Sequence, residues 1–237
     1  VYGTDDRLEK VYGPKVVLAA DEAGELTWTL DIEPLGPIAN VGVEISSSQA
    51  AHGTLYLDYL TWDGTLNLTL KRPDHNGRMW RRAWVNGVDH DNPNFPEAFR
   101  LAHNAGVGML LLGARDWTDY SVSSAITPHM VKSTGIAARV QGMRRYYALM
   151  LSAGGAVQLV KALDGWTVLA EKKIDWRLRG TYRLRLQVAG NRLQGWVDNQ
   201  LIFDLVDVER PLVNGGIALV CEEGRSATEC VEVRPCY

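Results

Sequence analysis

The sequence predicts an all-β protein whose main part is an antiparallel β-sandwich, and three observations lead to this prediction. Short runs that alternate apolar and polar residues follow one another from residue 99 to residue 235. Turn-forming residues separate the runs, as at 153–155, 164–165 and 198–199. Helical periodicity is nearly absent. Strands that recur every ~8–12 residues with turns between them are typical of sandwiches and barrels.

A smaller β segment is expected before the sandwich. Glycine and proline separate its strand-like runs, which are 15–20, 25–32, 39–47, 54–62 and 66–72. Residues 73–98 then change character and are rich in Pro, Asn, Asp and His. We therefore place a domain boundary near residue 78. Residues 1–78 are an N-terminal β segment, too short for a complete jelly roll, and 79–237 are the sandwich.

The strands of the sandwich are expected where apolar residues alternate between two faces. The runs are 99–104, 108–113, 120–126, 134–141, 146–152, 156–162, 166–174, 181–190, 192–199, 200–207, 215–223 and 230–235.

Composition excludes some classes of partner. The formal charge of −3 lacks the basic excess that non-specific nucleic-acid binding requires, so no nucleic acid is expected. No apolar run approaches the ~20 residues that span a bilayer, so no membrane partner is expected. Cys221 and Cys230 flank a hairpin-like loop, and either a bridge between them or two free thiols fits the sequence.

Several segments resemble a known family. They are DWTDYSV, GIAARVQ, RRYYALML, AVQLVKA, YRLRLQVAGNRLQGWVDNQLIFD and GGIALVCEEG. In this order they resemble the concanavalin A-like and laminin G-like lectin domains over about residues 79–233. The resemblance implies a jelly-roll sandwich of the kind often attached to carbohydrate-active enzymes.

A narrower resemblance covers nearly the whole chain. LTWTLDIEPLGPIANVGVEISS, GTLYLDYLTWDG, MWRRAWVNGVD and RVQGMRRYYALML resemble the non-catalytic C-terminal region of bacterial ADP-ribosylglycohydrolase-type proteins. The resemblance implies an accessory module, an upstream catalytic domain in the parent protein and a carbohydrate ligand. We expect a secreted or cell-surface location rather than a cytoplasmic one.

Three strands supply a candidate site for a sugar. Strand alternation turns Arg139, Gln141, Arg185, Gln194, Trp196 and Asp198 away from the core, and one of the tyrosines Tyr146 and Tyr147 is expected to be accessible. An indole can stack on a sugar ring, while guanidinium and carboxylate groups bind hydroxyls. The predicted ligand-binding set is Trp196, Arg139, Gln141, Asp198, Gln194, Arg185 and Tyr147. An ordinary solvated sheet face remains the alternative.

Catalysis is the second hypothesis, because enzymes also use this fold. Asp31 and Glu33 share a strand face but lack the third carboxylate of a glucanase motif. Arg139, Gln141 and Tyr147 resemble part of a polysaccharide lyase site, without its histidine. We therefore expect a non-catalytic module, with a glycan-cleaving enzyme or a purely structural accessory domain as alternatives.

No cofactor is expected. Asp89, Asp91, Asp116 and Asp119 offer the oxygen ligands that calcium requires, but they form no compact calcium-binding loop. A calcium ion at a loop end stays an open alternative.

Overall fold

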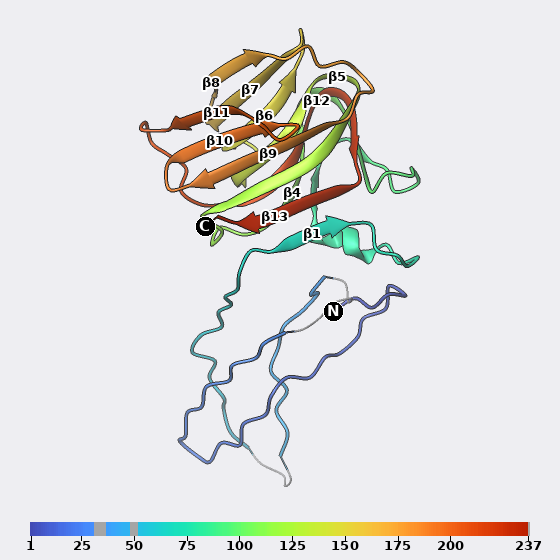
Figure 1. Cartoon of the computed structure of the whole chain (residues 1–237). Coiled ribbons are helices and arrows are strands. Elements are labelled where there is room, and N and C mark those ends of the chain that lie inside the picture. The colour runs from blue at the N-terminus through green and yellow to red at the C-terminus, as the bar shows by residue number, and fades with distance from the viewer. Residues whose placement is uncertain (31–36, 48–51, 237) are drawn as a thin grey trace. The chain divides into compact units, whose positions relative to one another are not determined.

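The computed structural model describes residues 1–30, 37–47 and 52–236, and these form two compact units. The first unit comprises Val1–Trp62 and Pro73–Ala83, and the second comprises Asp63–Arg72 and Trp84–Tyr237. The thirteen strands all belong to the second unit (Figure 1).

The first unit contains one short 3-10 helix, η1 (Met79–Ala83), near its C-terminal end. The carboxylate of Asp6 accepts hydrogen bonds from the amides of Arg78 at 2.7 Å and Met79 at 2.8 Å. These bonds to Met79 and Arg78 hold the pKa of Asp6 below its usual value, because they favour the ionised carboxylate.

Most strands predicted in the first unit are not formed. Among the described residues up to 67, the only β-pairing is an isolated bridge between Tyr2 and Leu8. The run 25–32 lies partly outside the described residues. Apolar alternation indicates which side chains share a face, whereas a strand also needs a neighbour to bond its backbone. The predicted run 66–72 does form β1 (Leu68–Lys71).

The second unit is the predicted antiparallel sandwich. Its remaining strands are β2 (Val85–Gly87), β3 (His90–Asp91), β4 (Phe99–Leu112), β5 (Tyr120–Gly142), β6 (Arg145–Ser152), β7 (Ala156–Leu163), β8 (Trp166–Lys173), β9 (Tyr182–Ala189), β10 (Arg192–Val197), β11 (Gln200–Val206), β12 (Gly216–Thr228) and β13 (Cys230–Pro235). The prediction of an all-β fold is confirmed.

Strand β5 belongs to both layers of the sandwich. The first layer has the order β11-β10-β9-β5-β13-β1, through the N-terminal half of β5. The second layer has the order β8-β7-β6-β5-β12-β4, through the C-terminal half, with β2 and β3 on the outer edge of β4. Figure 1 shows β9, β10 and β11 beside one another and β6, β7 and β8 as a separate group.

The core lies between the two layers. Leu184, Leu186 and Val188 of β9 are fully buried, as are Leu149 and Leu151 of β6. Strand β10 passes closely over β6, because a Cβ atom at Gly195 would lie 3.1 Å from Leu149 Cδ1. Glycine at this position lets the layers approach, and the large apolar side chains on either side fill the interior.

Candidate functional site

The outer face of the first layer carries part of the predicted site. Trp196 of β10 is paired with Arg185 of β9, and Gln194 is paired with Gln187, so these side chains share one face. The Arg185 guanidinium lies 3.6 Å from the centre of the half-buried Trp196 ring system. This stacking covers one face of the indole and leaves the other as the only face on which a sugar could stack.

Asp198 lies beside this face rather than on it. Asp198 and Asn199 form the turn between β10 and β11, with φ values of 48° and 66°. The Asp198 carboxylate accepts the amide of Arg183 at 2.8 Å, so it pins the end of β9 to the turn. The structure therefore brings Trp196, Arg185 and Gln194 together, with Asp198 at the end of the same hairpin.

The prediction that Arg139 faces outward is wrong. Its side chain is only 1% exposed. The pairing of β5 with β6 shifts between Ala138 and Gly142, and Arg139 has a φ of 51°, so strict alternation ends there. The guanidinium donates to the carbonyl of Leu212 at 2.6 Å and to Asp119 Oδ1 at 2.9 Å. Arg139 is a structural residue that ties loops together.

Tyr147 and Gln141 are also engaged elsewhere. Tyr147 is fully buried, and its hydroxyl donates to Asp207 Oδ2 at 2.5 Å while it accepts the amide of Leu212. The Gln141 amide donates to the side chain of Asn214 at 2.9 Å and to its carbonyl at 3.0 Å. Tyr146 is buried as well, so the expectation that one of the two tyrosines is accessible is wrong.

A second surface, which strand alternation did not predict, lies on the outer face of the second layer. A cavity of about 430 Å³ opens there, which we call the Trp166 cavity. Trp166, the first residue of β8, is 43% exposed and meets Tyr146 edge to face at 6.2 Å between ring centres. The other lining residues are Val107, Lys132, Ser133, Ser152, Ala153, Gln158 and Glu222.

The Trp166 cavity adjoins a buried apolar cluster. Residues on the outer side of this layer form a buried cluster: Met109, Ala137, Val140, Tyr146, Ala148, Met150, Val160, Ala162, Ala218 and Val220. Four of them are alanines, which leave room for the larger side chains to spread over the sheet. Burial and the nearby Glu222 carboxylate raise the pKa of Tyr146, so its phenol stays neutral at physiological pH.

Two hydrogen-bonded groups form the polar walls of the cavity. The ammonium of Lys132 lies 2.7 Å from Glu222 and 3.7 Å from Glu223, and the Ser133 hydroxyl donates to Glu222. The bond to Glu222 raises the pKa of Lys132, so this side chain stays cationic.

The second polar wall is formed by the side chains of Ser152 and Gln158. The Gln158 amide accepts from Ser152 at 2.8 Å and donates to Glu171 at 2.5 Å. The two walls present fixed hydroxyl, amide and charged groups beside an aromatic ring.

The sequence did contain a signal for Trp166. This residue follows the Asp164–Gly165 turn directly and begins an edge strand. A large aromatic side chain at the start of an edge strand has a neighbour on only one side, so part of it stays exposed. Strand alternation along β10 predicted Trp196 as the exposed aromatic residue instead.

The remaining candidates give no metal site in the described part of the chain, where no cluster of three His, Cys, Asp or Glu side chains could hold an ion. Asp119 bonds Arg139, and Asp89 accepts the amide of Asn104. Asp31 and Glu33 lie outside the described residues.

Cys221, Cys230 and Cys236 are free thiols, and burial raises the pKa of Cys221 to about 11. Within the described residues, no helix has the length and apolar character needed to cross a membrane.

The fold defines a lectin-like β-sandwich, and comparison with known families agrees. A family model described as the galactocerebrosidase C-terminal lectin domain matches residues 98–227, which is more than half of the chain. The chain belongs to this family. The matched region begins just before β4 and ends in β12, so it includes strands of both layers. No curated protein sequence matches the chain.

Solved structures confirm the jelly-roll fold. A carbohydrate-binding module, CBM66 from Bacillus subtilis, aligns with a TM-score of 0.57 at 20% identity, covering 64% of this chain and 95% of the module. A galectin-like protein of unknown function from Bacillus subtilis aligns with a TM-score of 0.56 at 11% identity, covering 73% of this chain and 97% of that one. At these identities the likeness shows the fold alone.

Proposed function

We propose that this protein is a non-catalytic carbohydrate-binding module that holds an uncharged sugar in the Trp166 cavity. The observation that carries the proposal is the half-exposed indole of Trp166 at a cavity with two polar walls. A sugar ring has an apolar face of C–H groups and a rim of hydroxyls. An aromatic ring beside fixed hydrogen-bonding groups matches both features.

The charges around the cavity indicate the class of sugar. Glu222 and Lys132 are the charged residues of the lining and form an ion pair with each other. Two further carboxylates lie just beyond the lining, that of Glu223 at 3.7 Å from Lys132 and that of Glu171 bonded to Gln158. An acidic sugar would face a net negative surround, whereas an uncharged sugar can donate its hydroxyl hydrogens to the free lone pairs of these carboxylates. Neutral hexoses and their oligomers are therefore the expected ligands.

Family membership supports this proposal, because the matched family is described as a lectin domain. The resemblance to the accessory region of ADP-ribosylglycohydrolase-type proteins stays a prediction, as do the upstream catalytic domain and the boundary near residue 78. The Trp196 face, with Arg185, Gln194 and Asp198, is proposed as a weaker contact surface because Arg185 already covers one face of the indole.

Isothermal titration of the whole chain against a panel of neutral and acidic oligosaccharides tests the proposal. Trp166→Ala should weaken binding of the best neutral ligand by about tenfold or more, equivalent to ~1.4 kcal/mol. Trp196→Ala is the matched control, because it removes the same side chain from the other layer, and it should have a smaller effect. Unchanged affinity in Trp166→Ala would remove this cavity from consideration.

The same samples test the alternative of catalysis. Incubation with polysaccharides should release neither reducing ends nor unsaturated products. Turnover that Asp31→Ala or Glu33→Ala abolishes would replace the binding module with a hydrolase.

A further inference from the structure

We propose a second saccharide-binding site on the outer face of the first layer, in a trough along strand β5. The trough is lined by residues of four strands and three connecting segments, and its lining contains no aromatic side chain. The inference rests on the proposed function in one respect, the class of ligand. It goes beyond that function because it assigns a second, chemically different site to the same module.

The register of the first layer creates the trough. The outward residues of β5 are small, namely Ser121, Ser123, Ala125 and Thr127. Longer side chains stand on both sides. Ala125 is paired with Arg183 of β9, and Ser123 is paired with Glu232 of β13. A row of short side chains between two rows of long ones leaves a channel, and a cavity of about 320 Å³ lies there.

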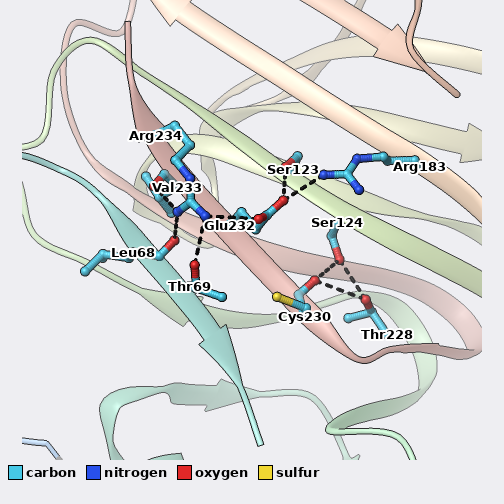
Figure 2. Close-up of polar contacts among 10 residues, drawn as sticks. All are labelled: Leu68, Thr69, Ser123, Ser124, Arg183, Thr228, Cys230, Glu232, Val233 and Arg234. Atoms are coloured by element: carbon cyan, nitrogen blue, oxygen red, sulfur yellow. Dashed lines mark hydrogen bonds and ion pairs between the residues drawn. The ribbon is translucent and has the colours of Figure 1, made fainter. Parts of the chain in front are cut away.

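Ion pairs cross the trough near Ser123, because Arg183 and Glu232 stand on its opposite sides. The Glu232 carboxylate lies 2.7 Å from the Arg183 guanidinium and 3.0 Å from that of Arg234 (Figure 2). Arg234 also donates to the hydroxyl of Thr69 on β1 at 2.8 Å. These contacts connect β9, β13 and β1 across the outer face, so this charged bridge is formed before a ligand arrives.

Hydroxyl groups continue the lining beneath and beyond these ion pairs. Figure 2 shows the Ser124 hydroxyl bonded to Thr228 at 2.8 Å and to the carbonyl of Cys230 at 2.8 Å. At the other end, the hydroxyls of Thr127 and Thr181 lie 2.8 Å apart. Each hydroxyl can both donate and accept, which suits the hydroxyls of a sugar.

Glu97 supplies the feature that points to a ligand. This side chain lines the trough, and its Oε1 atom accepts from Arg100 at 2.8 Å. Its Oε2 atom is buried and has no hydrogen-bond partner among the described residues. A buried carboxylate oxygen without a donor is unfavourable, because it has lost the hydrogen bonds that it makes with water in the unfolded chain. Because Oε2 is covered, the Glu97 carboxylate must turn toward the trough before a ligand can donate to it, and that hydrogen bond would remove this cost.

The chemistry of the lining favours an uncharged, hydroxyl-rich ligand over an anion. Glu97, Glu229 and Glu232 contribute carboxylates, and Arg183 is the only basic residue of the lining. Without an aromatic ring, recognition depends on hydrogen bonds. We therefore expect weaker binding than in the Trp166 cavity and stronger discrimination among the hydroxyl patterns of different sugars.

Nuclear magnetic resonance of the ¹⁵N-labelled chain, titrated with lactose, cellotetraose and trigalacturonic acid, tests the proposal. The variant Ala125→Phe fills the exposed floor of the trough, and Gln200→Phe adds the same ring at an exposed position of β11 as a control. A neutral probe should shift the amides of residues 123–127, 181–183 and 229–232 in wild type, in Trp166→Ala and in Gln200→Phe. It should not shift them in Ala125→Phe, and trigalacturonic acid should not shift them in any variant.

The possible outcomes separate the two sites. Shifts confined to residues around Trp166 would overturn the trough and leave the proposed function standing. Trough shifts that survive in Trp166→Ala but vanish in Ala125→Phe support the second site, even if the Trp166 cavity proves silent. Trough shifts that persist in Ala125→Phe, or no shifts at either site with any probe, would overturn the trough proposal. The last result would count against the proposed function as well.

Discussion

The outer sides of the two layers of the sandwich carry different kinds of side chain. On the outer side of the second layer the side chains are apolar and buried, as with Met109 and Met150, and one indole, Trp166, is exposed at the margin. The face of the first layer is covered by paired charges, including Arg183 with Glu232 and Arg192 with Asp204. The second layer offers a ligand the exposed ring of Trp166, whereas the first layer offers mainly hydrogen bonds, because Arg185 covers one face of its Trp196 ring.

This difference shows how one fold can hold two kinds of site. In both layers the inward residues of each strand are committed to the shared core, so only the outward residues are free to vary. The number of carboxylates near a site then decides the charge of the ligand, and the presence of an aromatic side chain decides whether a ring is held by stacking.

Both outer faces lie over the same buried interior. Of the variants proposed, Asp207→Ala should destabilise that interior most. Asp207 lies 2.6 Å from Lys161, and both side chains are less than a tenth exposed. Removing one partner of a buried pair leaves the other charge uncompensated, which costs ~3–5 kcal/mol. We expect urea unfolding to show a loss of this size.

Asp204→Ala is the matched control for this variant. Asp204 lies 2.6 Å from Arg192 in an equally short pair, but the side chains are 34% and 55% exposed. Solvated pairs of this kind contribute ~0–1 kcal/mol. Equal losses in the two variants would contradict the distinction between the interior and the outer face of the first layer.

Acid should weaken the same interior without any mutation. Burial opposes ionisation of Asp207, but hydrogen bonds from Lys161 and Tyr147 outweigh it and lower the pKa of Asp207. The stabilisation is therefore fully present above the unfolded-state pKa of ~3.9 and declines as pH falls through the lower folded-state value. Urea unfolding at pH 7, 5 and 3 should show the difference between wild type and Asp207→Asn shrinking only at pH 3.

The polar wall of the Trp166 cavity gives the next largest effect. Glu222→Ala removes the acceptor of Lys132 and Ser133, and it should weaken binding of a neutral oligosaccharide about ten- to hundredfold, since hydrogen bonds to charged groups contribute ~1.5–3 kcal/mol. Titration calorimetry measures this loss. Asp204→Ala should leave the affinity for the same ligand unchanged, and a loss of similar size there would mean that the two faces are not independent.

Most of the sandwich could be predicted from the sequence because its strands obey one simple rule. In β9, Leu184, Leu186 and Val188 point inward and Arg183, Arg185 and Gln187 point outward, as alternation requires. The rule failed at Arg139, where a bulge and a positive φ turn a charged side chain into the interior. Neither feature has a mark in the sequence, because arginine is not a residue that usually adopts this conformation.

The candidate site was harder to predict because it depends on which strands are neighbours. Trp166, Glu222 and Lys132 come from β8, β12 and β5, and only the folded second layer brings them to one cavity. In the N-terminal segment the same pattern predicted strands that the structure does not contain among the described residues. Its apolar alternation at 39–47 and 54–62 resembles that of β9, yet these residues have no ladder partner in the described structure.

The variant with the smallest expected effect, Arg183→Gln, tests whether the outer face of the first layer is exposed to solvent. Arg183→Gln removes the ion pair with Glu232, which joins side chains that are 54% and 31% exposed. Because water screens such a pair, the loss of stability should stay below ~1 kcal/mol and shrink further in 1 M salt, where the Debye length is ~3 Å. Thermal unfolding at low and high salt, with Arg192→Gln as the matched variant on the same face, measures this difference. A larger loss that salt leaves unchanged would mean that Arg183 is part of a structural network, and the trough along β5 would then be a packed seam rather than an open channel.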